Sequence, residues 1–568
     1  MLKITRRSGL KTALIAGGLP LARVARAGTG ISGSGGSTLV STSGLVSPRV
    51  TPWFERLFIP DVLAPAALNP AFQPIEPARD WWGPYTHQRY AEFPAKKFYQ
   101  LNVQNANWSF HSELPKASLF TYGGTLPGPM IHATYGEPIV VRVNNMLQNI
   151  HYGFGFPDTA THLHNMHAAS ESDGYPGDFV TPGNYRDQHY PMICSGYDTF
   201  PNPRGYGDYR ESLGTLWYHD HRIDHTAENV YRGLYGLFNA FDDYDTGNET
   251  DPRATALRLP SGDCDIPLSF LDPQFDPKGN VFFDVFDTEG HLGDKVAVNG
   301  KIQPYLDVQR RKYRFRLLDA GPSRFYQFFI SQGLPSAGQK TWVPMTLIAN
   351  DGNLLEKPLT VDNVLMGVAN RMDVIVDFTD FHDGDALYLV NRLEQVSGRG
   401  PTANLMDPGV PVLQFRVHGL VPAHDPSVVP PLLRPLARPT EAELKSAVHR
   451  SWEFDRTNGS WAVNGKLADL KEVRATVTRG TTEIWTLVNK SGGWSHPIHI
   501  HYEEFQILSR NGAPPPPFEV GRKDVAILGP NETCQIFFRF GEFTGKYVMH
   551  CHNVVHEDHA MMIRFDVV

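Results

Sequence analysis

Cysteine is scarce in this sequence, with 4 residues among 568. A disulfide scaffold packs several cysteines into a short chain, so that class of protein is excluded. Long apolar runs are lacking too, because no stretch of the sequence reaches the roughly 18 apolar residues of a membrane-spanning helix. We therefore expect a chain without a membrane anchor, long enough to fold on hydrophobic cores of its own.

An excess of positive charge is also missing. The formal net charge is −8 at pH 7. Because an acidic protein is repelled by phosphate backbones and anionic lipids, nucleic acid is an unfavourable partner. We expect a monomer that acts on small molecules and has no nucleic-acid partner.

Residues 1–27 resemble an export signal. A basic start, Thr5-Arg6-Arg7-Ser8-Gly9-Leu10-Lys11, precedes an apolar run over residues 12–22 and the small-residue cleavage pattern Ala25-Arg26-Ala27. The Arg6-Arg7 pair resembles a twin-arginine signal, and an ordinary secretory signal is the alternative. We therefore expect a periplasmic or extracellular protein, exported by the twin-arginine route.

Glycine and proline are plentiful, at 51 and 45 residues, which favours turn-rich β structure. Residues 28–95 form a Gly/Ser/Thr-rich linker followed by a Pro- and Trp-rich lead-in, which we expect to wrap the first domain. Beyond it, a glycine turn followed by a β-rich run occurs three times. The turns are Tyr122-Gly123-Gly124-Thr125, Val298-Asn299-Gly300-Lys301 and Val463-Asn464-Gly465-Lys466, and the runs cover residues 139–144, 313–317 and 484–489.

This spacing is too long for a solenoid and favours three related β domains in tandem. We place them at residues 96–250, 251–430 and 431–568.

Four His-x-His pairs stand out among the 23 histidines. Residues i and i+2 of a strand face the same side, so each pair presents two imidazoles in one direction. Neutral imidazole binds copper, zinc, iron and nickel. Two pairs fall in the first domain and two in the third, which predicts a metal cluster between these domains. The pairs are His162/His164, His219/His221, His499/His501 and His550/His552.

The last pair encloses a thiol, in His550-Cys551-His552. Strand alternation sends Cys551 to the face opposite its two neighbours. His556 and Met561 follow in the sequence, and two histidines, one cysteine and a weak axial methionine form a blue-copper site. The second histidine would be His496, which lies an odd number of residues before His499 and can therefore face Cys551.

The segments that contain these residues resemble the four copper signatures of multicopper oxidases, with the greatest similarity to bacterial spore-coat laccases and bilirubin oxidases. The resemblance covers residue 95 to the C-terminus. It implies an all-β chain of three tandem cupredoxin-like domains, each a Greek-key β-barrel, and four copper ions. It implies a type 1 copper at His496, Cys551, His556 and Met561, a type 2 copper at His162 and His499, and a type 3 pair at His164, His219, His221, His501, His550 and His552.

The resemblance also implies an activity. A laccase-like oxidase takes single electrons from phenols, aromatic amines or tetrapyrroles and reduces O2 to water. His496 would be the entry point of electrons, Cys551 would pass them to its neighbours, and Asp173 and Glu557 would move protons. An oxidase of metal ions such as Mn(II) or Cu(I) and a copper-binding scaffold without activity are the alternatives.

Several residues near the motifs receive no ligand role. We expect His167, His225 and His559 to be surface or supporting histidines. One disulfide among Cys194, Cys264 and Cys534 is plausible in an oxidising compartment, with its pairing open.

Overall fold

The computed structural model describes residues 38–68, 86–148 and 153–568. The expected signal over residues 1–27 lies outside this part of the chain. Most described residues lie in strands or turns, and helices are short. No helix within the described residues has the length and apolar character that crossing a membrane requires. The α-helices are α2 (Thr226–Tyr231), α3 (Glu441–Ser446) and α4 (Val554–Asp558), and the 3-10 helices are η1 (Ser170–Ser172), η2 (Tyr209–Glu211), η3 (Gly262–Cys264) and η4 (Pro517–Glu519).

The first domain consists of two four-stranded sheets, with strand orders β2-β1-β4-β6 and β3-β8-β7-β5. Their bounds are β1 (Lys97–Trp108), β2 (Ala117–Tyr122), β3 (Gly128–Thr134), β4 (Ile139–Asn145), β5 (Thr161–His164), β6 (Tyr185–Tyr190), β7 (Thr215–Asp220) and β8 (Tyr235–Phe241).

The second domain has a seven-stranded sheet, β13-β12-β9-β15-β20-β17-β18, a five-stranded sheet, β14-β22-β21-β16-β19, and the pair β10-β11. Their bounds are β9 (Asp265–Leu271), β10 (Gln274–Phe275), β11 (Val281–Phe282), β12 (Ala297–Val298), β13 (Lys301–Ile302), β14 (Tyr305–Gln309), β15 (Lys312–Asp319), β16 (Tyr326–Gln332), β17 (Met345–Asn350), β18 (Asn353–Val361), β19 (Asn363–Met366), β20 (Arg371–Asp377), β21 (Ala386–Leu393) and β22 (Leu405–His418).

The third domain has a six-stranded sheet, β24-β23-β26-β31-β28-β29, and a five-stranded sheet, β25-β33-β32-β27-β30. Their bounds are β23 (Val448–Thr457), β24 (Ser460–Val463), β25 (Val473–Val477), β26 (Thr482–Asn489), β27 (His496–Ile500), β28 (Phe505–Arg510), β29 (Arg522–Lys523), β30 (Val525–Leu528), β31 (Thr533–Arg539), β32 (Gly545–Cys551) and β33 (Met562–Val567).

The three domains repeat one pattern of strand pairing. A strand before the glycine turn pairs in parallel with a strand after it, as β1 with β4, β9 with β15, and β23 with β26. The second sheets repeat a parallel pair as well, β3 with β8, β14 with β22, and β25 with β33. These matched crossovers agree with three cupredoxin-like Greek-key barrels. The exact domain ends near residues 250 and 430 stay predictions.

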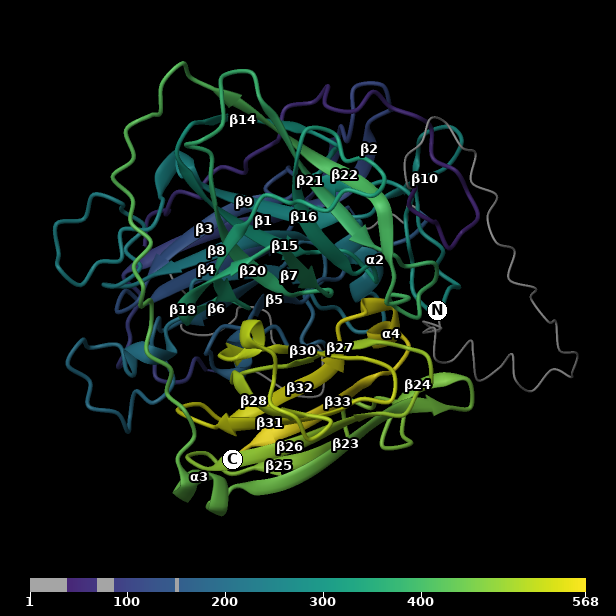
Figure 1. Cartoon of the computed structure of the whole chain (residues 1–568). Coiled ribbons are helices and arrows are strands. Elements are labelled where there is room, and N and C mark those ends of the chain that lie inside the picture. Colours follow the sequence, from purple (N-terminus) through teal and green to yellow (C-terminus); the bar gives the residue numbers. More distant parts are fainter. Residues whose placement is uncertain (1–37, 69–85, 149–152) are drawn as a thin grey trace, which may run out of the picture.

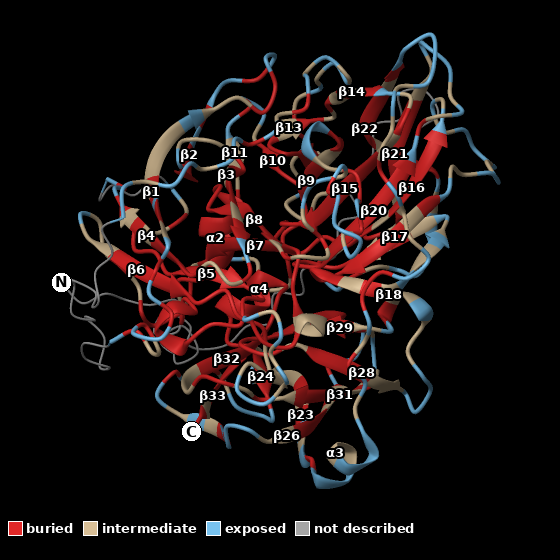
Figure 2. Ribbon diagram, turned by 90° about the vertical axis from the view of Figure 1, so that its left-hand side faces the viewer, coloured by how far each residue is buried: buried red, intermediate tan, exposed pale blue. Residues whose placement is uncertain are grey.

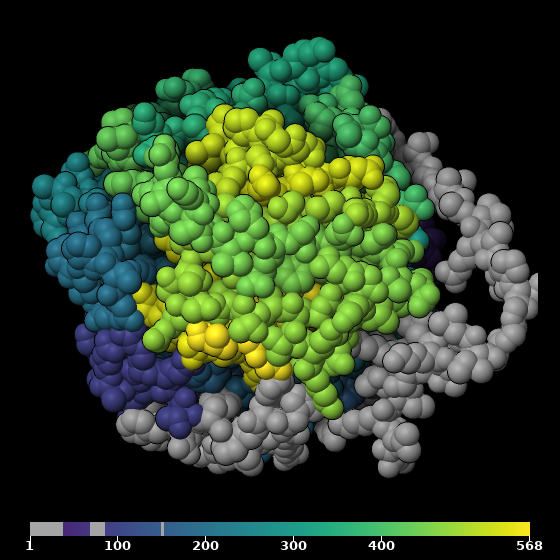
Figure 3. Space-filling model, turned by 90° about the horizontal axis from the view of Figure 1, so that it is seen from below, coloured from purple at the N-terminus to yellow at the C-terminus, as the bar shows by residue number. Residues whose placement is uncertain are grey.

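Each domain encloses its own hydrophobic cluster, centred on Val103 in the first, Phe315 in the second and Trp485 in the third. In Figure 1 the strands of the third domain, β23 to β33, lie together below those of the other two domains. Figure 3 shows that green to yellow residues form most of the molecule's face when it is seen from below. The first and third domains meet near α2 and α4, and Figure 2 shows these helices buried near the centre of the molecule.

The described part of the lead-in contacts two domains. Val62 forms a bridge with Met130 of the first domain, and Arg56 forms one with Tyr305 of the second. We expected this segment to wrap the first domain alone, but it also contacts the second domain. The disulfide prediction is wrong, because all four cysteines are free and buried.

Candidate metal centre

The four His-x-His pairs lie on two antiparallel strand pairs that face each other across the domain contact. β5 pairs with β7 so that His162 lies opposite His219, and β27 pairs with β32 so that His499 lies opposite His550. Each of these four histidines is followed, two residues later in the chain, by a second histidine that faces the same side. We call these eight residues the histidine cluster: His162, His164, His219, His221, His499, His501, His550 and His552.

Ring nitrogens from both domains converge in the histidine cluster. The His221 Nε2 atom lies 3.2 Å from the Nε2 atoms of both His501 and His550. The rings of His164 and His499 stack with centroids 3.8 Å apart. Several triads, such as His162, His164 and His219, place one ligand atom each within 4.8 Å of one another. Side chains that lie 280 and 329 residues apart in the sequence thus belong to one compact donor set.

Hydrogen bonds at the outer edges of the rings fix their orientation. The Nδ1 atoms of His219 and His499 each lie 2.9 Å from a backbone carbonyl, that of Asp220 and of Asp524, and Nδ1 of His162 bonds the Asp173 carbonyl. Their Nε2 atoms are buried and have no hydrogen-bond partner among the described residues. An imidazole that donates its Nδ1 hydrogen outward presents an Nε2 lone pair inward, which is the orientation a metal ion needs.

Burial also favours the form of histidine that binds metals. Removal from water lowers the pKa of His162, His499 and His552 well below the usual value, and neighbouring histidines add to the effect. The rings are therefore neutral, as metal ligands are. The donor set fits copper, for which imidazole is a preferred ligand.

Two buried carboxylates support the histidine cluster. The His501 Nδ1 atom lies 2.7 Å from Asp173 Oδ2. Glu557 contacts both domains' histidines, with its two carboxylate oxygens 3.1 Å from His221 Nδ1 and 2.9 Å from His550 Nδ1. Burial raises the pKa of Asp173. Burial would also raise the pKa of Glu557, but the two adjacent imidazoles lower it overall.

A third buried carboxylate, Asp524, was not predicted from the sequence. Its Oδ2 atom lies 2.9 Å from His164 Nε2, and Arg371 forms an ion pair with it at 2.9 Å. Asp524 precedes β30 and belongs to no motif with ligand spacing. A lone carboxylate between Lys523 and Val525 gives no signal in the sequence.

A second donor set lies around Cys551. Its Sγ atom is 3.5 Å from His496 Nδ1 and 3.6 Å from His556 Nδ1, and the two Nδ1 atoms are 3.2 Å apart. The buried Met561 is held beside them, because its N–H donates to the His556 carbonyl and its carbonyl accepts from the Cys551 N–H. We call His496, Cys551, His556 and Met561 the cysteine site.

The environment of the cysteine site restricts its chemistry. Burial raises the pKa of the Cys551 thiol well above its usual range, so a bound cation is needed to hold the thiolate. His496 is fully buried, with its Nε2 atom 2.7 Å from Ser491 Oγ. The His556 Nε2 atom lies 2.9 Å from the Glu289 carbonyl. Electron entry at His496 stays a prediction, and the ring itself is closed to direct contact with a donor.

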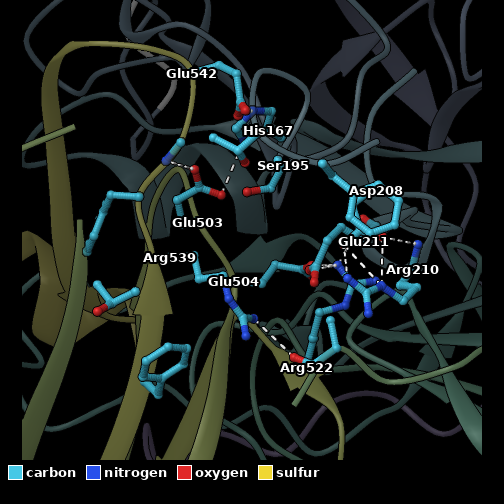
Figure 4. Close-up of a pocket in the computed structure, with 18 of the residues that line it drawn as sticks. His167, Ser195, Asp208, Arg210, Glu211, Glu503, Glu504, Arg522, Arg539 and Glu542 are labelled. Atoms are coloured by element: carbon cyan, nitrogen blue, oxygen red, sulfur yellow. Dashed lines mark hydrogen bonds and ion pairs between the residues drawn. The ribbon is translucent and has the colours of Figure 1, made fainter. Parts of the chain in front are cut away.

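A cavity of about 680 Å³, lined mostly by polar and charged residues, lies between the first and third domains (Figure 4). Its wall includes Asn165, which follows His164 in the chain, and Glu504, which accepts a hydrogen bond from it at 3.0 Å. His167, which we expected at the surface or in a supporting role, is buried in this wall between Glu503 and Glu542, at 3.2 and 2.9 Å. These carboxylates outweigh the effect of burial and raise the pKa of His167 to about 10.

The two remaining histidines near the motifs have local partners. His225 is partly exposed, and its Nδ1 atom lies 3.7 Å from Glu228. The His559 Nδ1 atom lies 2.7 Å from the Val555 carbonyl of its own helix.

Comparison with known proteins identifies the family. A model described as multicopper oxidase matches residues 434–568, and a second with the same description matches residues 102–195. The bilirubin oxidase of Albifimbria verrucaria is 34% identical over 83% of this chain and 76% of its own length. The laccase of Bacillus subtilis strain 168 is 29% identical over 83% of this chain and 94% of its own.

Among solved structures, a laccase from Pediococcus acidilactici shares the fold. Its TM-score is 0.72 at 21% identity, over 92% of this chain and 95% of that one. The fold, the two donor sets and the curated relatives lead to one conclusion: this chain belongs to the multicopper oxidase family, is an oxidoreductase, and has copper as its cofactor.

Proposed function

We propose that the chain is a laccase-like oxidase that holds four copper ions. The cysteine site would hold one type 1 ion. The histidine cluster would hold a type 2 ion at His162 and His499 and a type 3 pair at the other six histidines. Bound copper would supply one-electron oxidation of a donor and four-electron reduction of O2 to water. The observation that supports this proposal is the sequence His550-Cys551-His552, which joins the two donor sets through adjacent residues of β32.

The chain's own residues divide the work between the two sites. Cys551 belongs to one site while both its neighbours belong to the other, so a short covalent path connects them. Asp173 and Glu557 bond the outer nitrogens of His501, His221 and His550 and orient these rings. Burial favours the protonated form of Asp173, whereas the two adjacent imidazoles keep Glu557 ionised. The cavity between the domains is lined by Asn165, the chain neighbour of His164.

We propose phenols and related aromatic compounds as the donors, since the curated relatives include a laccase and a bilirubin oxidase. Oxidation of Mn(II) or Cu(I) is the second candidate. Steady-state kinetics on phenols, bilirubin, Mn(II) and Cu(I) distinguish these two candidates.

Copper loading of the purified chain tests the proposal. We expect four copper ions per chain, an intense absorption band at about 600 nm from a copper–thiolate bond, and O2 consumption with a phenol. A colourless copper-loaded protein contradicts the assignment of the cysteine site. A blue protein that consumes no O2 with any donor is an inactive copper-binding scaffold.

We further propose that the protein is exported through the twin-arginine route and that it functions as a monomer. The support is the Arg6-Arg7 pair within a basic, apolar, small-residue sequence. Replacing both arginines with lysine should retain the protein in the cytoplasm, as cell fractionation would show. Unchanged export of this variant would indicate an ordinary secretory signal.

A further inference from the structure

The second domain supplies no residue of the two donor sets, but one of its arginines reaches the edge of the histidine cluster. Arg371 is the first residue of β20 and is fully buried. Its Nη1 and Nη2 atoms donate to Asp524 Oδ1 and Oδ2 at 3.0 and 2.9 Å, so the guanidinium holds both oxygens of the carboxylate. Asp524 Oδ2 also lies 2.9 Å from His164 Nε2. Three side chains, one from each domain, therefore contact one another in series.

The remaining N–H groups of Arg371 are bonded as well. A guanidinium has five N–H donors, and the other three of Arg371 bond backbone carbonyls. Nε bonds that of Thr215 at 3.3 Å, Nη1 that of Ala369 at 2.8 Å and Nη2 that of Asp351 at 3.0 Å. Because the guanidinium is planar and rigid, these bonds hold the Asp524 carboxylate in one orientation. The single ammonium of a lysine could not make all of them.

The ring of His164 depends on the Asp524 carboxylate. His162, His219 and His499 turn Nδ1 outward to a backbone carbonyl. The ring of His164 is reversed, because Nε2 faces Asp524 and Nδ1 is buried without a hydrogen-bond partner among the described residues. No carbonyl of the described chain bonds this ring. The carboxylate of Asp524 therefore determines which nitrogen His164 presents to a metal ion.

The loop between β17 and β18 secures the same junction. Asn165, which follows His164, donates to the Asp351 carbonyl at 2.8 Å, and Lys523, which precedes Asp524, forms an ion pair with the Asp351 carboxylate at 2.7 Å. Gly352 packs so closely against the first domain that a Cβ atom there would lie 2.7 Å from the Thr215 carbonyl. The second domain thus holds the chain neighbours of both His164 and Asp524.

We propose that Arg371 is a positioning residue for the histidine cluster: it fixes the Asp524 carboxylate and, through it, the ring of His164. The second domain, which offers no ligand, would in this way help to set the geometry of the metal centre. Domain docking alone would need only the opposite charges of Arg371 and Asp524, whereas positioning needs the two-pronged contact. This inference rests on the proposed function, because it concerns the copper ions that we assign to the histidine cluster.

The copper affinity of the variant Arg371→Lys tests the proposal. Lysine keeps the positive charge but loses the fork that grips both oxygens of Asp524. We expect the Kd of copper at the histidine cluster to rise about 10–100-fold, while the blue band of the cysteine site stays unchanged. Competition with a copper chelator, without any donor present, gives the Kd, and metal analysis counts the ions that are lost. An unchanged affinity, or equal weakening at both donor sets, overturns the proposal.

Arg314→Lys is the matched control. Arg314 is a fully buried arginine of β15, the strand that pairs with β20, but it bonds Asp373 and Asp245 instead of Asp524. Chemical denaturation should show that both lysine variants lose unfolding free energy, whereas Arg314→Lys should bind copper as the wild type does. Equal loss of copper in the two variants would mean that any damaged ion pair of this domain has the effect, and would overturn the proposal.

Asp524→Asn tests the link between Arg371 and His164, and it keeps the proposal testable if the lysine variant does not fold. An amide has one acceptor oxygen, which cannot serve both Arg371 and His164 as the carboxylate does. We expect a loss of copper affinity similar to that of Arg371→Lys. The double variant should lose no more than Asp524→Asn alone, because Arg371 acts through Asp524. Additive losses would contradict this route.

These measurements need no turnover, so they separate the role of Arg371 from the proposed function. If the wild type binds copper in both donor sets but oxidises no donor, the proposed function fails, and the comparison of Kd values still decides whether Arg371 positions the cluster. If the wild type is an active oxidase and Arg371→Lys binds copper equally well, only the positioning role fails.

Discussion

Single hydrogen bonds determine which nitrogen of each histidine faces the interior. His219 and His499 are tied by backbone carbonyls, whereas His501, His221 and His550 are tied by carboxylates. Carboxylates differ from carbonyls because they can also take up a proton. Substitutions at Asp173 and Glu557 should therefore affect turnover more than metal content.

Asp173→Asn should slow O2 reduction by about 10–100-fold and leave the blue absorption intact. The amide keeps the size of the side chain and the backbone carbonyl that His162 uses, but it cannot carry a proton to the His501 edge. Stopped-flow reoxidation of the reduced enzyme measures the effect. Asp263→Asn, at an exposed position, is the control. Unchanged reoxidation in Asp173→Asn would refute a proton-transfer role.

Met561→Leu should raise the redox potential of the type 1 copper that we propose for the cysteine site. Loss of a weak axial ligand destabilises the oxidised ion more than the reduced one. A potentiometric titration of the blue band gives the value. Met345→Leu, a similar change in the core of the second domain, should not alter it. A lower potential in Met561→Leu would contradict the axial assignment.

The residues in paired motifs could be found from the sequence, and those without a motif could not. The period of a strand predicts which histidines share a face, and in the structure His496 lies with Cys551 whereas His499 lies in the histidine cluster. Asp524, Ser491 and Glu289 reach the sites from distant segments. Their proximity depends on how the domains dock, which local spacing does not record. Burial of His167 between two glutamates has the same origin.

At the scale of elements, the three glycine turns are equivalent two-residue hairpins. Gly123 and Gly124, Asn299 and Gly300, and Asn464 and Gly465 all have positive φ angles, between 47° and 88°. Consecutive residues of this kind match the twist of a tight hairpin. The sequence therefore predicted these turns and the strands that follow them, β4, β15 and β26. It could not predict that Gly300 lies against the first domain.

Alanine substitutions should distinguish the equivalent turns. Gly465→Ala meets no atom within 4 Å, so it should cost only the strain of a left-handed residue, about 1–2 kcal/mol. Gly300→Ala would collide with the Leu126 carbonyl and lie 2.8 Å from Trp108 Nε1, which adds roughly 1–3 kcal/mol. Chemical denaturation of both variants compares the two losses of unfolding free energy. Equal losses of unfolding free energy would contradict this expectation, because they would mean that the first domain shifts at no cost to make room for the methyl group at residue 300.

For the whole molecule, the shared ligand set should couple copper binding to thermal stability. Metal that binds only the folded chain stabilises it by about 4 kcal/mol at roughly 1,000 times its Kd. Removal of copper by a chelator should therefore lower the unfolding temperature, as calorimetry would measure. In the variant His164→Ala/His499→Ala the shift should be smaller. Identical unfolding temperatures with and without copper would mean that the cluster does not join the domains.

The histidine cluster also sets an order of events during biosynthesis. Half of its imidazoles precede residue 222 and the other half follow residue 498. A nascent chain on the ribosome thus exposes an incomplete set of donors until residue 552 has been translated. Stable metallation has to wait until the third domain has left the ribosome, and a chain that stops before residue 550 would lack both His550 and His552.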